Sequence, residues 1–77
     1  MNKQGKKQIE KWIDTLTNMK EDIESMQEEE QDKFDNLPEG IQESERCEAI
    51  QESADNLENA ASSIDDAISE LQEIIDR

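Results

Sequence analysis

The sequence predicts an all-α protein, an antiparallel two-helix hairpin of coiled-coil type that forms a single domain over residues 1–77. Three observations predict it. Apolar residues recur at spacings of three and four, which is the periodicity of one face of a helix. Strand-forming aromatic residues are scarce, with one Trp, one Phe and no Tyr. The only proline, Pro38, stands close to Gly40 near the middle of the chain, where the two residues favour a turn.

The second helix, expected over about residues 44–76 with Ser44 as its N-cap, has the more regular pattern. Its apolar residues alternate as the a and d positions of four heptads: Cys47, Ile50, Ala54, Leu57, Ala61, Ile64, Ile68, Leu71 and Ile75. A further apolar line, at the g positions, consists of Ala60, Ala67 and Ile74. Because a two-stranded seam needs only the a and d positions, this wider stripe favours assembly of two hairpins into a dimeric four-helix bundle.

The first helix is expected over about residues 6–35, followed by a turn over about 36–43. Its apolar residues are less regular: Ile9, Trp12, Ile13, Leu16, Met19, Ile23 and Met26. A turn centred near residue 40 pairs residues whose numbers add up to about 80. This register predicts that Met19 faces Ala61 and that Met26 faces Ala54, so that large side chains meet small ones.

Charge limits the kinds of partner that the chain can bind. The formal net charge is −14, with +3 in residues 1–20 and −17 in residues 21–77. Such a field repels nucleic acid and anionic membranes and attracts basic surfaces, so we expect a protein partner with a basic surface. The single cysteine, Cys47, allows no intrachain disulfide, and no apolar segment is long enough to span a membrane. We therefore expect the protein in the cytoplasm.

Catalysis, a cofactor and a metal site are not expected. The chain has no His, which excludes the common nucleophilic triads and the histidine-containing zinc and di-iron motifs. The twelve residues from Asp32 to Glu43 have the length of a calcium-binding loop. However, Phe34 stands where the third-position oxygen ligand belongs and Leu37 where the turn glycine belongs.

A candidate binding site lies beside the predicted turn. In the expected register, Glu30 and Lys33 interrupt the seam of the first helix and leave Ile50 and Cys47 poorly covered. The sequence therefore predicts an apolar patch with an acidic surround, which is a common arrangement at protein interfaces. The predicted partner-binding residues are Phe34, Leu37, Ile41, Cys47 and Ile50, together with the acidic residues Glu43, Glu48, Glu52 and Asp55.

The run Phe34-Asp35-Asn36-Leu37-Pro38-Glu39-Gly40-Ile41-Gln42-Glu43-Ser44-Glu45-Arg46 and the heptads after it resemble small acidic helical-hairpin proteins encoded by bacteriophages and prophages. The resemblance covers about residues 28–77. It implies a hairpin and a phage-derived inhibitor or modulator of a host protein, such as a component of antiviral defence. Two alternatives stay open: an acidic DNA mimic that occupies a nucleic-acid-binding groove, and a structural or assembly coiled-coil protein.

Overall fold

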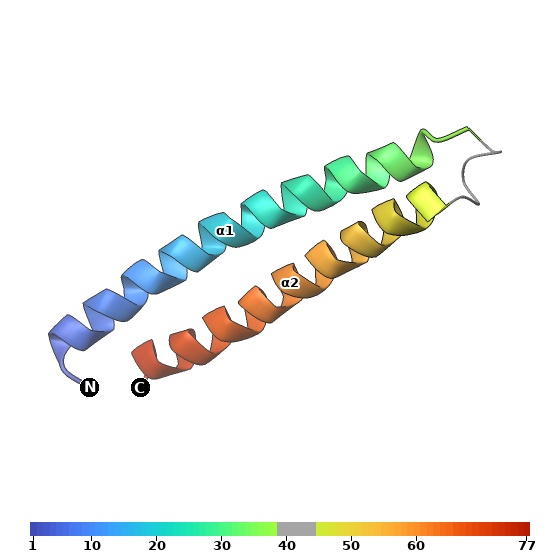
Figure 1. Cartoon of the computed structure of the whole chain (residues 1–77). Helices are drawn as coiled ribbons and strands as arrows, with labels where there is room; N and C mark the ends of the chain where they lie inside the picture. Colours follow the sequence, from blue (N-terminus) through green and yellow to red (C-terminus); the bar gives the residue numbers. More distant parts are fainter. Residues whose placement is uncertain (39–44) are drawn as a thin grey trace.

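The computed structural model consists of two long helices that lie side by side and run in opposite directions (Figure 1). Helix α1 spans Lys3–Asp35 and helix α2 spans Glu45–Ile75. The structure describes residues 1–38 and 45–77, so the predicted N-cap Ser44 lies outside the described residues. The molecule measures 59 × 14 × 14 Å, and the two termini meet at the end opposite the turn. The predicted all-α hairpin is confirmed.

Helix α1 begins three residues earlier than predicted because Asn2 caps it. The Asn2 side-chain oxygen accepts a hydrogen bond of 2.8 Å from the Gly5 amide, which would otherwise lack a partner at the helix start. The helix ends at Asp35, as predicted. There the Asn36 amide donates to the Asp32 carbonyl at 3.0 Å, and two residues later Pro38 disfavours a helical conformation of the residue before it.

The predicted seam of α2 is confirmed. All nine of its predicted a and d residues are buried or half-buried. The most enclosed are Cys47 and Ala54, each 3% exposed, and Ala61, which is 6% exposed. Small side chains at these three a positions let the two helices approach closely, so they form the most enclosed part of the interface.

The predicted seam of α1 is wrong in part. The inward residues of α1, together with Leu37 just after its end, are spaced alternately by three and four residues, and all are buried or half-buried. They are Lys6, Ile9, Ile13, Leu16, Lys20, Ile23, Gln27, Glu30, Phe34 and Leu37. Trp12, Met19 and Met26, which were expected in the seam, are 50%, 48% and 54% exposed. Trp12, Met19 and Met26 are seven residues apart, and the next position in this series is the charged Lys33. The observed seam instead continues to the apolar residues Phe34 and Leu37. The observed seam therefore keeps apolar side chains at both ends of the helix.

The register also differs from the predicted one. Pairs that meet across the hairpin, such as Lys20 with Asp65 and Glu30 with Ser53, have residue numbers that add up to between 83 and 85. Compared with the prediction, α1 is therefore displaced along α2 by about one helical turn. Ala61 lies level with Ile23, not with Met19, and Ala54 lies level with Glu30.

One cross-helix ion pair joins the two helices in this register. The Lys20 amine, at an a position, lies 2.9 Å from an Asp65 carboxylate oxygen on α2 and 3.8 Å from a Glu24 oxygen. The hydrogen bond to Asp65 raises the pKa of Lys20 above its ordinary value of 10.5. A lysine at an a position lowers stability, and its ion pair with Asp65 favours the observed register over alignments that take Asp65 out of its reach.

The buried alanines give a first test. Replacing both Ala54 and Ala61 with Leu should overfill the tightest part of the seam, at a cost of about 1–3 kcal/mol for each site. Circular dichroism should show a clearly lower melting temperature. The matched control is Ala49→Leu, at an exposed position of the same helix, which should leave melting nearly unchanged. An equal loss in the control and in the double variant would contradict the observed seam.

Lys20 gives a second test. We expect Lys20→Met to raise the melting temperature by several degrees, because an apolar side chain replaces a cation in the seam. The control is Lys11→Met on the exposed side of α1. In the wild type, the raised pKa of Lys20 means that the ion pair stabilises the fold at neutral pH and is lost as pH rises above that pKa. The stability gap between wild type and Lys20→Met should therefore widen at alkaline pH, and a constant gap would refute this role.

Candidate protein-binding surfaces

The residues predicted to form an apolar patch beside the turn pack mainly within the hairpin. Phe34, Leu37 and Ile50 are half-buried and Cys47 is buried, whereas Ile41 and Glu43 lie outside the described residues. The expectation that Glu30 and Lys33 leave Cys47 uncovered is wrong. Glu30 does lie in the seam, but Lys33 points outward and donates to the Glu30 carboxylate at 2.8 Å. Their part in partner binding stays a prediction.

The predicted acidic residues of α2 lie at the surface. Glu48, Glu52 and Asp55 are all exposed. Spacings of four and three place them on one side of the helix, within about 10 Å along its axis. Among the residues that the structure describes, every ion pair involves Lys20 or Lys33 of α1, and none involves these three carboxylates. Asp55 accepts only a hydrogen bond, of 3.1 Å, from the Gln51 amide.

The hairpin distributes its charge unevenly between its two halves. Residues 1–20 carry +3 and residues 64–77 carry −4, so the half that holds the termini has a net charge of −1. Residues 21–63, which form the half nearer the turn, carry −13. Lys33 and Arg46 are the only cations in that stretch of sequence. The turn half is therefore the strongly negative part of the molecule.

A second surface follows from the exposed residues of α1. In the observed seam, Trp12, Met19 and Met26 occupy g positions, and α2 carries Ser53, Ala60, Ala67 and Ile74 at g positions. Nearest the turn, the g positions hold the cations Lys33 and Arg46. In an antiparallel pair the g positions of both helices border the same side of the seam. These seven uncharged residues form what we call the apolar face. The opposite side, at the e positions, holds Glu24 and Asp65, which Lys20 connects.

The sequence predicts the α2 half of the apolar face as the g line of Ala60, Ala67 and Ile74, but it places the α1 half in the seam. Trp12, Met19 and Met26 are seven residues apart, as are Ala60, Ala67 and Ile74. Sevenfold spacing describes one heptad position, but it does not say whether that position packs inside the hairpin or borders it. The structure decides this: the three large side chains of α1 are about half exposed, and Ala60 and Ala67 are exposed.

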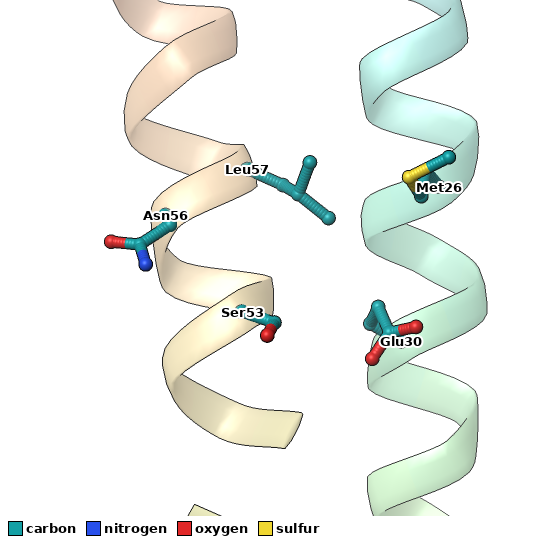
Figure 2. Close-up of a pocket in the computed structure, with 5 residues that line it drawn as sticks. All are labelled: Met26, Glu30, Ser53, Asn56 and Leu57. Atoms are coloured by element: carbon teal, nitrogen blue, oxygen red, sulfur yellow. The ribbon is translucent and has the colours of Figure 1, made fainter. Parts of the chain in front are cut away.

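Two shallow hollows interrupt the apolar face. Figure 2 shows one of them, where Leu57 of α2 extends toward Met26 of α1 while Glu30 and Ser53 lie across from each other. The other is lined by Trp12, Thr15, Leu16 and Leu71. Each hollow combines an exposed g residue with a d residue of the seam, so the face offers recesses that an incoming side chain can fill.

The described residues hold no group of three His, Cys, Asp or Glu side chains placed to bind a metal ion. In the same ranges, neither helix is long and apolar enough to cross a membrane. No protein family model, no curated protein and no solved structure matches this chain. The functional argument therefore rests on the chain's own two surfaces, the acidic side of α2 and the apolar face.

Proposed function

We propose that the protein is a non-catalytic protein–protein interaction module that binds a basic protein surface with the acidic side of α2 nearest the turn. The observation that carries this proposal is the exposure of Glu48, Glu52 and Asp55 without an ion-pair partner among the described residues. Helices in monomeric proteins commonly combine charges of both signs, since ion pairs one turn apart stabilise them. Carboxylates without such partners are available to lysine or arginine side chains of another protein.

A long helix suits this role because it holds the carboxylates at fixed positions. The partner need not order them on binding, which lowers the entropic cost of association. The −13 charge of residues 21–63 also attracts a basic surface at a distance and accelerates encounter. The acidic side thus supports both rapid approach and a defined set of contacts.

The resemblance to phage-encoded hairpins supports a more specific version of the proposal. In it, the partner is a host protein in the bacterial cytoplasm, such as a component of antiviral defence, and the hairpin inhibits it by covering a basic functional surface. The shape is consistent with occlusion, since the rod is 59 Å long. The chemistry of the partner follows from the charges, whereas the choice of a defence protein rests on the resemblance alone.

A matched pair of variants tests the proposal. The triple variant Glu48→Gln, Glu52→Gln, Asp55→Asn removes three negative charges near the turn. The control, Asp66→Asn, Glu70→Gln, Glu73→Gln, removes three exposed charges from the other half of the same helix. Proteins captured from a bacterial lysate by the immobilised wild type should bind the first variant roughly tenfold more weakly, because it loses three ion pairs with the partner. They should bind the control nearly normally.

Two other outcomes would contradict the proposal. Equal weakening by both triple variants would mean that net charge alone governs capture, without a local contact surface. Unchanged binding by both would place the contact elsewhere. Titration of the captured complex with salt tests the DNA-mimic alternative. If many carboxylates occupied a nucleic-acid groove, the binding affinity should fall much more steeply with ionic strength than it would for three contacts.

A further inference from the structure

The proposed binding of a basic protein leaves the apolar face unexplained. Trp12, Met19 and Met26 expose about half of their area in a chain that is only 31% hydrophobic. They form a row that extends about 21 Å along α1. Exposed apolar rows of this kind on a highly charged protein mark a surface that another molecule covers. The acidic side of α2 proposed above as a docking surface is separate from this face.

We propose that a second copy of the chain covers the apolar face and runs in the opposite direction, so that α1 packs against α1 and α2 against α2. The arrangement is a dimeric four-helix bundle with its two-fold axis beside Met19. This inference goes beyond the proposed binding of a basic protein and does not depend on it.

The uneven charge of the hairpin favours an antiparallel dimer over a parallel one. In a parallel dimer the two turn halves, each with −13, would lie side by side, and their mutual repulsion would oppose assembly. In the antiparallel dimer each turn half lies along the terminal half of the other copy, which carries only −1 and contains the Lys-rich start of α1. The antiparallel dimer therefore separates the two most negative regions.

The spacing of the row fits the same arrangement. Trp12 precedes Met19 by seven residues and Met26 follows it by seven. A two-fold rotation about an axis beside Met19 therefore brings Trp12 of one copy level with Met26 of the other. Trp12 would then enter the hollow lined by Met26, Glu30, Ser53, Asn56 and Leu57 (Figure 2) and pack on its two apolar side chains, Met26 and Leu57. The contact would occur twice by symmetry. At the border of the row, Lys11 comes within about 3 Å, along the helix axis, of the level of Glu29 in the other copy.

The small residues of α2 complete the interface. In the observed register, Met19 lies level with residues 64 and 65 of α2, so the two-fold axis passes α2 at that level. The exposed residues Ala60 and Ala67 lie on either side of the axis. Alanine side chains let the two copies of α2 approach closely, while Trp12 and the methionines fill the wider space between the two copies of α1. A large row on one helix and a small row on the other thus form one continuous interface.

Disulfide trapping tests both the occupant and its direction. In a Cys47→Ala background, Met19→Cys should oxidise to a covalent dimer in high yield, because the two cysteines meet at the axis. The matched control is Glu21→Cys, which is exposed at the same level of α1 but points away from the row, and it should remain largely monomeric. Trp12→Cys should form few dimers alone but should cross-link when mixed with Met26→Cys.

Sedimentation measurements complete the test. The wild type should show twice the 8.9 kDa mass of the chain, and Trp12→Ala should weaken dimerisation at least roughly tenfold while circular dichroism reports unchanged helicity. A wild type that stays monomeric at several hundred micromolar would overturn the proposal. A dimeric wild type whose Met19→Cys variant does not cross-link would overturn the antiparallel arrangement. The lysate experiment uses none of these residues, so either proposal can fail without the other.

Discussion

The structure depends on one narrow seam between α1 and α2. Among the described residues, only Ile9, Cys47, Ala54 and Ala61 are buried, and the other seam residues are half-buried. A rod of two helices has no deeper interior, because each helix has a single neighbour. The apolar residues of the chain must therefore be concentrated in this seam if the folded state is to offset the entropy lost by ordering two long helices.

The thinness of the seam explains why it tolerates polar residues. Lys20, Gln27 and Glu30 occupy inward positions, yet water lies within reach of each. Lys20 extends to Asp65 at the border of the seam, and Glu30 accepts a hydrogen bond from Lys33. These residues weaken the core, but they also restrict the ways in which the helices can align. Stability is thus exchanged for a defined register, which in turn places Trp12, Met19 and Met26 at the surface.

Charge and packing divide the surface among different roles. The e side contains the Lys20 ion pairs, the g side is apolar, and the outer side of α2 is acidic. The repulsion within residues 21–63 opposes folding of the turn half, so a molecule that supplies cations or covers apolar area should stabilise the hairpin. A basic partner on the acidic side of α2 would supply the cations, and a second copy on the apolar face would cover the apolar area. A dimer could therefore display an acidic surface at each of its ends.

The sequence by itself determined the class of the fold, the end of α1 at Asp35, the seam of α2 and the uneven charge. Each of these follows from local information: capping and turn residues, an unambiguous spacing from Cys47 to Ile75, and the order of charged residues. The inward side of α1 could not be read in this way, because α1 carries two neighbouring apolar lines, one through Ile13 and Leu16 and one through Trp12 and Met19. Only the packing of α1 on α2 decided between them. Extending one seam through Phe34 and Leu37 left the row of Trp12, Met19 and Met26 exposed beside the g line of α2, and so completed a surface of which periodicity alone predicts only the α2 half.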